Sequence, residues 1–310
     1  MHPTILVTGA AGGSMGATGN RLTRKLLEKG LAVRAFVHRE DERSKQLDAL
    51  GAEIAVGDLL DIQPVRKAMK GIERVYFCYQ VKPGLLEATT IMSHVAKEES
   101  VQFILNLSQG SASEESPSPT GRRHWLSERV FDWSGIPTCH LRGSVFYENL
   151  FRQFAQGIEE ASELRAPFGS GDAKVPAIAA HDIAQLAFVA LRNPQHFIGK
   201  TLLVFGTLFS LNELARELTT LLGRPIRYRQ VSPEAWIAEA EIREGTRNRE
   251  MIDHLVNLWK GILQVNQSPT MAARLPELSG LYKKLTGASP LALAEWVKLN
   301  RVGLEAGVPQ

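Results

Sequence analysis

The residues with the clearest chemistry in this sequence are the glycines between positions 9 and 19. Gly9 follows a short apolar run, and Gly16 and Gly19 precede a helical pattern of leucines. Glycine lets a backbone come close to a phosphate, and the amides at a helix N-terminus attract that anion. The stretch therefore predicts a dinucleotide site. The residues expected to form its phosphate loop are Gly9, Gly13, Ser14, Met15, Gly16, Ala17, Thr18 and Gly19.

The loop is longer than the standard G-x-x-G-x-x-G pattern. Counting back from the helix places the glycines at 13, 16 and 19, whereas counting forward from the strand places the first one at Gly9. About three extra residues therefore lie between Gly9 and Gly16, and the alignment of the loop stays open by that amount. A flexible linker is the alternative, but linkers do not sit between a buried strand and a helix.

A strand and a helix must hold this loop in place. Residues 5–7 predict a strand buried on both faces, and Leu22, Leu26 and Leu27 then recur at helical spacing. Residues 32–37 supply a second strand, so the segment closes as a βαβ unit. In such a unit Gly9 permits the turn out of the strand, and Gly19 lets the helix pack against the sheet.

Arg39 stands just past the second strand, where the type of side chain selects the cofactor. An acidic residue there would bind the ribose 2′-hydroxyl of NAD, whereas an arginine accommodates the 2′-phosphate of NADP. The sequence has the arginine, which favours NADP(H) and leaves NAD(H) as the alternative. A solvated surface arginine is the other interpretation of this residue.

The first half of the chain continues as alternating strands and helices. Strands are predicted at residues 53–58, 74–79 and 103–108, and again at 138–141 after a helix over 123–133. This alternation is typical of a doubly wound parallel sheet, the Rossmann arrangement, which binds ligands beyond the carboxyl ends of its strands. The residues expected there are Asp58 and Leu59 beside the adenine, Tyr79 and Gln80 along the ribose, and Ser108 and Gln109 toward the reacting end.

Bulk composition limits the class of protein. The 310 residues are 44% hydrophobic and 22% charged, with a net charge of +3 and no basic cluster interleaved with aromatics. Neither nucleic-acid binding nor a membrane span is expected from these numbers, and the first strand begins directly at the N-terminus, which predicts a cytoplasmic protein. Cys78 and Cys139 lack metal or redox spacing and are expected to be buried free thiols, so no metal site is predicted.

The second half is expected to form a smaller, mainly helical substrate region. We place the dinucleotide-binding domain at 1–155, with a strand near 201–206 returning to it, and the substrate region at 156–310. Residues 177–184 predict a helix start capped by Asp182, and Ser210 with Glu213 predicts a capping box. Just before the boundary, Phe146, Tyr147 and Asn149 are candidates, together with Gln109, for a substrate pocket, with a core role for Phe146 as the alternative.

Several short motifs together resemble one family. Residues 7–10, the glycine loop, residues 57–59, His124-x-x-x-Glu128, residues 134–137 and the stretch from Arg142 to Asn149 are similar to the NmrA-like branch of the atypical short-chain dehydrogenases/reductases. The resemblance covers roughly residues 4–210. It implies a Rossmann domain with a smaller C-terminal substrate region and a preference for NADP(H). That family includes both reductases and redox-sensing proteins without demonstrated catalysis.

The chain departs from the wider superfamily at the proton donor. The Tyr-x-x-x-Lys pair that delivers a proton to a carbonyl oxygen in the wider superfamily is absent. His124 stands where NmrA-like reductases place a lysine four residues before a helix glutamate, and Thr120 stands where the tyrosine of the pair would be. His124 is either a general acid, a ligand of the nicotinamide ribose, or a surface or capping residue. Ser108 is the second candidate for a catalytic role.

These observations predict an NADP(H)-dependent reductase of a small, partly apolar organic substrate. The alternative is an NADP(H)-binding redox sensor that acts through a protein partner without catalysis. A homo-oligomer is compatible with either hypothesis.

Overall fold

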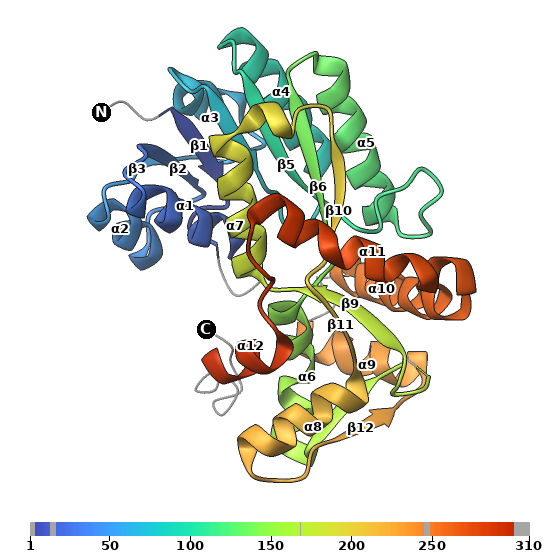
Figure 1. Cartoon of the computed structure of the whole chain (residues 1–310). Coiled ribbons are helices and arrows are strands. Elements are labelled where there is room, and N and C mark those ends of the chain that lie inside the picture. Colours follow the sequence, from blue (N-terminus) through green and yellow to red (C-terminus); the bar gives the residue numbers. More distant parts are fainter. Residues whose placement is uncertain (1–3, 13–16, 168, 245–248, 301–310) are drawn as a thin grey trace. The chain divides into compact units, whose positions relative to one another are not determined.

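The computed structural model describes residues 4–12, 17–167, 169–244 and 249–300 (Figure 1). It contains a seven-stranded sheet in the order β10-β6-β5-β4-β1-β2-β3. The pairs β1/β2, β1/β4, β2/β3, β4/β5 and β5/β6 are all parallel. The predicted doubly wound parallel sheet is therefore confirmed. The strands are β1 (Ile5–Thr8), β2 (Val33–Val37), β3 (Glu53–Val56), β4 (Arg74–Phe77), β5 (Phe103–Gln109), β6 (Thr138–Gly143) and β10 (Thr201–Val204).

Helices cover both faces of this sheet, as each crossover between parallel strands requires. Helix α1 packs against α7 on one face, while α3, α4 and α5 pack in succession on the other (Figure 1). The helices are α1 (Thr18–Glu28), α2 (Glu42–Ala49), α3 (Ile62–Met69), α4 (Leu85–Glu98), α5 (Pro119–Ser134) and α7 (Ala180–Arg192).

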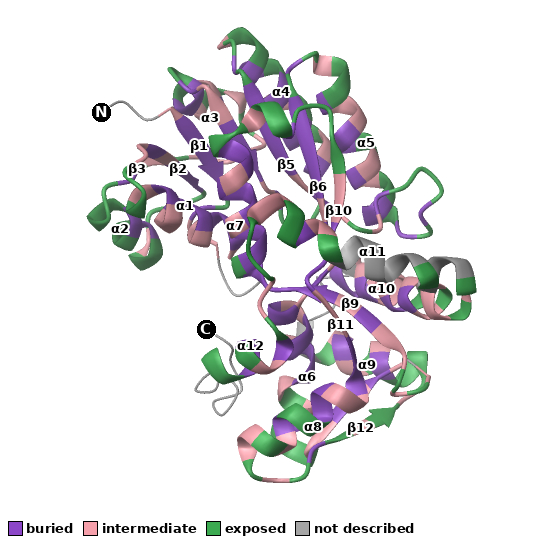
Figure 2. Ribbon diagram, viewed as in Figure 1, coloured by how far each residue is buried: buried purple, intermediate pink, exposed green. Residues whose placement is uncertain are grey.

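The strands carry the buried core of the sheet. Every residue of β1 is buried, as the uninterrupted apolar run predicts, and the core between the sheet and the α3–α4–α5 layer contains Phe77 and Phe131 (Figure 2). Their rings meet edge to face with centroids 5.2 Å apart. Such a core holds the strand ends in place, and the side chains expected to bind ligands follow those ends.

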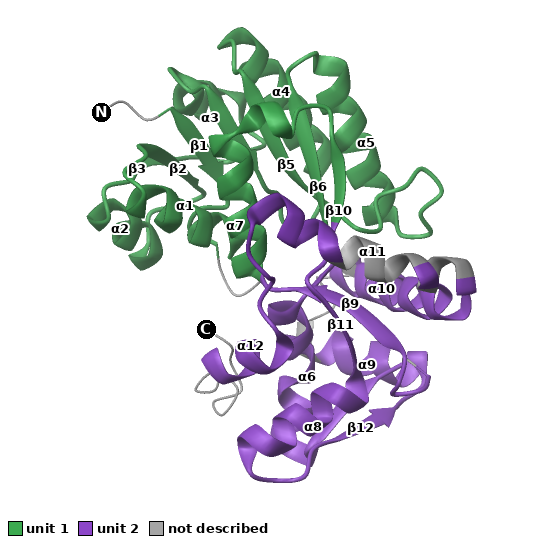
Figure 3. Ribbon diagram, in the orientation of Figure 1, with its two compact units in different colours: residues 1–143, 180–203 green, residues 144–179, 204–310 purple. Residues whose placement is uncertain are grey.

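Contacts divide the chain into two compact units that are discontinuous in sequence (Figure 3). The first comprises residues 1–143 and 180–203, and the second comprises 144–179 and 204–310. Residues 201–203 of β10 belong to the first unit and join its sheet beside β6. The division falls at Gly143, whereas the sequence predicts a domain boundary at 155.

The second unit combines small sheets with helices. A three-stranded sheet has the order β11-β9-β7, and β12 pairs with β8. Its strands are β7 (Val145–Phe146), β8 (Glu163–Ala166), β9 (Lys174–Ile178), β11 (Thr207–Ser210) and β12 (Arg227–Gln230). Its helices are α6 (Tyr147–Ala161), α8 (Leu211–Leu222), α9 (Pro233–Glu244), α10 (Arg249–Gln267), α11 (Pro269–Thr286) and α12 (Leu293–Leu299), and a 3-10 helix (Pro194–His196) lies in the first unit.

One prediction in this region is wrong and one is confirmed. Residues 177–178 end strand β9 rather than begin a helix, because Val175 and Ala177 alternate inward and pair with β11. Helix α7 begins only at Ala180, so Asp182 lies inside its first turn and is not the N-cap. The capping box of α8 is present: Glu213 N donates to Ser210 Oγ, and Ser210 N donates to the Glu213 carboxylate.

Candidate functional site

The glycine-rich loop begins where β1 ends. Gly9 adopts φ +66°, a conformation that favours glycine, and Gly12 N donates to Gly9 O at 2.9 Å. Ala17 also has positive φ and stands as the N-cap of α1 without a side-chain cap, so the first amides of the helix are not satisfied by a capping side chain. The predicted residues Gly13, Ser14, Met15 and Gly16 lie outside the described residues.

Gly19 sits where no other residue fits. A Cβ on Gly19 would lie 2.6 Å from Gly9 O and 2.7 Å from Thr8 O. Helix α1 therefore lies so close to β1 that only glycine fits at this position. Gly12 is similarly crowded, because its Cβ would lie 3.0 Å from Gly9 O. The sequence pattern points to Gly19 for this packing role but does not single out Gly12.

Buried hydroxyls fix the loop to the sheet beneath it. Thr8 Oγ1 accepts from Cys78 N at 2.8 Å and donates to Cys78 O at 2.9 Å, which ties the end of β1 to the end of β4. Tyr76 OH donates to Thr18 Oγ1 at 2.9 Å and so ties β4 to the start of α1. Burial raises the pKa of Tyr76 well above its ordinary value, so this phenol stays protonated.

A pocket of about 280 Å³ opens at these strand ends. Residues following β1, β2, β3 and β4 line it, which is the edge where a doubly wound sheet binds ligands. Of the predicted cofactor residues it brings together Gly9, Arg39, Asp58, Leu59, Tyr79 and Gln80. Its other lining residues are Ala11, Gly12, Phe36, Val37, His38, Asp41, Arg43, Gly57, Cys78 and Lys82.

Two arginines and one carboxylate line the part of the pocket that follows β2. Arg39 is exposed and lies 3.9 Å from the Asp41 carboxylate, and Arg43 Nε donates to Asp41 Oδ2 at 3.1 Å. Asp41 also caps α2 by accepting from Arg43 N and Ser44 N. The hydrogen bonds from Arg43 lower the pKa of Asp41 to about 2. Asp41 thus holds Arg43 at the pocket, and Lys82, which follows β4, adds a third cation to the pocket lining.

Asp58 and Tyr79 are both fixed by local contacts. Asp58 Oδ1 accepts from Leu60 N at 3.0 Å, and its other oxygen lies 3.9 Å from His38 Nδ1. The Tyr79 hydroxyl donates to Pro83 O at 2.8 Å, and Lys82 Nζ lies 5.4 Å from the centre of the Tyr79 ring. These contacts hold an aromatic face and a carboxylate at the pocket wall.

Cys78 corrects the expectation of two buried strand thiols. It follows β4, is only partly buried and lines the pocket, whereas Cys139 is fully buried in β6. Burial of the sulfur raises the pKa of Cys78 to about 11, so the group is a thiol near neutral pH.

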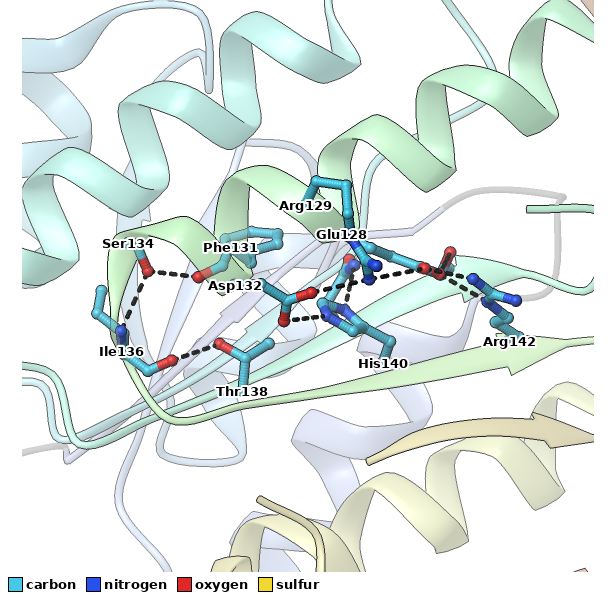
Figure 4. Close-up of polar contacts among 11 residues, drawn as sticks. Glu128, Arg129, Phe131, Asp132, Ser134, Ile136, Thr138, His140 and Arg142 are labelled. Atoms are coloured by element: carbon cyan, nitrogen blue, oxygen red, sulfur yellow. Dashed lines mark hydrogen bonds and ion pairs between the residues drawn. The ribbon is translucent and has the colours of Figure 1, made fainter. Parts of the chain in front are cut away.

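The end of β5 carries a triad of Ser108, Glu128 and Arg142, in which Ser108 and Glu128 are buried and Arg142 is partly exposed. Ser108 Oγ donates to Glu128 Oε1 at 2.6 Å, while Arg142 donates from Nε to the same oxygen at 2.9 Å and from Nη2 to Oε2 at 2.6 Å. Figure 4 shows Glu128 of α5 facing Arg142 of β6. Ser108 and Arg142 are register partners on neighbouring strands, so one carboxylate joins three elements.

A second polar cluster, in which His140 and Asn106 are buried and Asp132 is exposed, lies one turn further along α5. His140 Nε2 contacts Asp132 Oδ1 at 3.1 Å (Figure 4). His140 Nδ1 contacts the Asn106 side-chain amide nitrogen at 3.1 Å. Since that amide nitrogen can only donate, Nδ1 accepts and Nε2 carries the proton toward Asp132. Arg129 also contacts Asp132, at 2.8 Å. This cluster fixes α5 over β5 and β6.

The remaining predicted residues are not among those lining the pocket. His124 lies on α5 with its side chain buried, and Gln109 accepts from Ser111 Oγ at 3.4 Å. Phe146, Tyr147 and Asn149 belong to the second unit. Tyr147 is fully buried there, with its ring 5.9 Å from that of Phe209 and 5.6 Å from that of Trp296. Trp236, Trp259 and Trp296 are also buried, so they belong to the core of the second unit.

The parts of the chain that the structure describes contain neither a cluster of metal-binding side chains nor a helix that could span a membrane. Those parts contain no group of three or more His, Cys, Asp or Glu residues that could hold a metal ion. Nor does any helix in those ranges combine the length and apolar character that crossing a bilayer requires.

Comparison with known proteins identifies the family. The chain matches the NmrA-like family over residues 1–286. It is 30% identical over 297 residues to the NAD(P)H azoreductase of Xenophilus azovorans, which covers 95% of this chain and 98% of that protein. Its fold is similar to that of the NADPH-dependent quinone oxidoreductase QOR2 of Escherichia coli complexed with NADPH, with a TM-score of 0.78, 24% identity, and coverage of 95% of this chain and 99% of that one.

A transcriptional regulator shares the same fold. The structure of NmrA, a negative transcriptional regulator, in complex with NADP gives a TM-score of 0.78 at 16% identity, covering 99% of this chain and 98% of that one. Likeness at this level of identity concerns the fold alone. The match over residues 1–286 decides the family: this chain belongs to the NmrA-like family.

Proposed function

We propose that this protein is an NADP(H)-dependent reductase of a small, partly apolar organic substrate. The observation that carries the proposal is the pocket at the ends of β1 to β4, which joins a glycine loop to three cationic side chains. A glycine loop at a helix start suits a pyrophosphate, and clustered cations suit an additional phosphate. NADP(H) carries both groups.

The described residues fit such a dinucleotide. Gly9 and Gly12 leave backbone exposed at the pocket, where a Cβ on Gly12 would already meet the loop. Phe36 and Tyr79 offer aromatic surface, and Arg39, Arg43 and Lys82 offer positive charge. Asp41 offsets part of that charge, so discrimination between NADPH and NADH rests on guanidinium geometry as well as on charge.

The reduced nicotinamide, when bound, would supply a hydride. The chain's own part would be to bind and orient, and Ser108 at the end of β5 and His124 on α5 remain our candidates near the reacting end. The proposal also draws on the azoreductase relative, whose name records NAD(P)H as its reductant. Substrates with azo or quinone groups are the classes to test first.

Replacing Arg39 is expected to remove most of the preference for NADPH. A charge-assisted hydrogen bond contributes about 1.5 to 3 kcal/mol, so Arg39→Ala should lower the affinity for NADPH by roughly tenfold to a hundredfold and leave the affinity for NADH nearly unchanged. Calorimetric titration of both cofactors measures this. Arg66→Ala is the matched control, because Arg66 pairs with Glu98 on the surface and is absent from the pocket. Equal wild-type dissociation constants for the two cofactors would refute the assignment.

Cys78 offers a direct footprint of the pocket. With its pKa raised to about 11, only about one thiol in a thousand is ionised at pH 8, so alkylation by iodoacetamide should be slow and should accelerate about tenfold per pH unit. Saturating NADPH is expected to slow labelling of Cys78, as followed by peptide mass spectrometry. Cys139 is the internal control, since it is fully buried and should stay unlabelled with or without NADPH. Labelling of Cys78 at the same rate in both samples would place the cofactor elsewhere.

Turnover distinguishes the reductase from the sensor. We expect NADPH to be oxidised in the presence of one or more members of a panel of azo dyes, quinones, enones, imines and aldehydes, followed by the absorbance of the reduced cofactor. Loss of turnover in His124→Ala would assign that residue a part in the chemistry, whereas retained turnover would exclude it as an obligate proton donor.

The sensor is the second candidate because Thr120 and His124 replace the tyrosine and lysine of ordinary reductases. The same fold serves a regulator that binds NADP. A sensor requires only the dinucleotide pocket and a surface that differs between the oxidised and reduced complexes. No oxidation of NADPH across the panel, together with a protein partner whose affinity depends on the redox state, would establish this candidate in place of the reductase.

A further inference from the structure

The triad of Ser108, Glu128 and Arg142 at the end of β5 restricts what Ser108 can do. A serine hydroxyl has one proton, and Ser108 gives it to Glu128 Oε1 at 2.6 Å. Hydrogen bonds to a carboxylate are about twice as strong as neutral ones, so this proton is not readily redirected. The Ser108 oxygen keeps its lone pairs, and any further partner of that oxygen must therefore be a donor.

Glu128 is itself locked in place. It is fully buried, and the Arg142 guanidinium contacts both of its oxygens. Arg142 donates to both Glu128 oxygens, so both oxygens serve as acceptors in this triad. Arg142 and Glu128 thereby fix the direction of the Ser108 hydroxyl.

The position of Ser108 suggests which donor meets it. The pocket follows β1 to β4 and ends with residues 78–82 after β4, and β5 is the next strand of the sheet. If the adenosine half of NADPH occupies the pocket, the nicotinamide half continues toward the end of β5. Its ribose hydroxyls are hydrogen-bond donors.

We propose that Ser108 is an acceptor for a hydroxyl of the nicotinamide ribose, and that Glu128 and Arg142 are positioning residues that act through it. This inference rests on the proposed binding of NADP(H). Ser108 thus orients the cofactor and is not the proton donor of the reduction.

Two probes separate the halves of the cofactor. NADPH contains the nicotinamide ribose, and adenosine 2′,5′-bisphosphate contains only the adenosine half with its 2′-phosphate. In calorimetric titrations, Ser108→Ala is expected to lower the affinity for NADPH about three- to tenfold, which is the effect of one hydrogen bond, and to leave the affinity for the bisphosphate unchanged. Ser127→Ala is the matched control, because Ser127 is a fully buried serine of the same helix as Glu128 whose hydroxyl bonds Thr89.

A double-mutant cycle tests the positioning role. In Glu128→Gln, either orientation of the amide sets its NH2 group against a donor of Arg142, so the hydrogen bonds of the triad are disrupted. The affinity for NADPH should then fall as it does in Ser108→Ala. If Glu128 acts through Ser108, the double variant binds NADPH no more weakly than Ser108→Ala alone. Additive losses would assign Glu128 a separate effect and overturn its positioning role.

The outcomes distinguish this inference from the proposed function. If the wild type binds neither probe, the proposed function fails. If it binds both and Ser108→Ala binds NADPH equally well, or weakens both probes alike, the acceptor role is wrong while NADP(H) binding stands. Where turnover is measurable, the KM for NADPH should rise about three- to tenfold in Ser108→Ala, in parallel with the dissociation constant, and a fall in kcat of about a hundredfold or more would identify Ser108 as a proton donor instead.

Discussion

Gly19→Ala is expected to destabilise the protein and to impair NADPH binding. The new Cβ would lie 2.6 Å from Gly9 O and 2.7 Å from Thr8 O, and both are backbone atoms of β1 and its loop that cannot turn aside. Helix α1 would have to move away from the sheet, a change that costs about 1 to 3 kcal/mol in an overpacked site. The same movement displaces the helix start, so we expect at least a tenfold loss of NADPH affinity. Urea unfolding and calorimetric titration measure the two effects.

Gly261→Ala provides the comparison. Gly261 is also inside a helix, α10, but a Cβ there would meet no atom within 4 Å. Alanine is favoured over glycine in a helix by about 1 kcal/mol, so this variant should be neutral or more stable. If Gly19→Ala behaved like Gly261→Ala, the close packing of α1 on β1 would not be a constraint, and the assigned role of Gly19 would be wrong.

The sequence predicts the sheet well because parallel strands buried on both faces are continuous apolar runs. Residues 5–7 show this pattern, and the glycine loop with its following leucines marks the crossover. Strand ends in such a sheet converge at one edge, so the sequence alone places Arg39, Asp58 and Tyr79 near one another, and all three line the pocket. Local pattern and topology therefore suffice for this part of the candidate site.

The second unit is less predictable because its strands are short and partly polar. Residues 163–166 and 207–210 are not predicted as strands, and β9 contains Pro176, which argues against a strand in sequence. Their pairing partners lie far along the chain, as β8 pairs with β12 some 60 residues later. Such strands are defined by tertiary pairing rather than by local propensity.

Two parts of the site required the structure. Arg43 lines the pocket because Asp41 caps α2 and holds its guanidinium, and the spacing of Asp41 and Ser44 is a capping signal that could have revealed this helix. The role of Glu128 was not accessible from sequence. Its partners Ser108 and Arg142 are 20 and 14 residues away, and only the register of β5 on β6 brings them together.

Glu128→Ala is expected to be the most destabilising of the proposed substitutions. It would leave the Arg142 guanidinium, whose side chain is 24% exposed, without its carboxylate, and Ser108 without its acceptor. Removing one partner of a buried ion pair costs about 3 to 5 kcal/mol, mainly because the other charge is left uncompensated. Urea unfolding of the wild type and the variant measures the difference.

An exposed arginine–glutamate pair in the same chain shows how much of the expected destabilisation comes from burial rather than from charge. Arg66 donates to Glu98 from Nε at 3.0 Å and from Nη2 at 3.2 Å, but Glu98 is 40% exposed whereas Glu128 is fully buried. Glu98→Ala should therefore cost at most about 1 kcal/mol, because water solvates the arginine that remains. The joint replacement Glu128→Leu with Arg142→Met removes both charges and should recover much of the stability lost in Glu128→Ala. Equal losses for Glu98→Ala and Glu128→Ala, or no recovery in the joint variant, would mean that the uncompensated arginine is not the source of the effect.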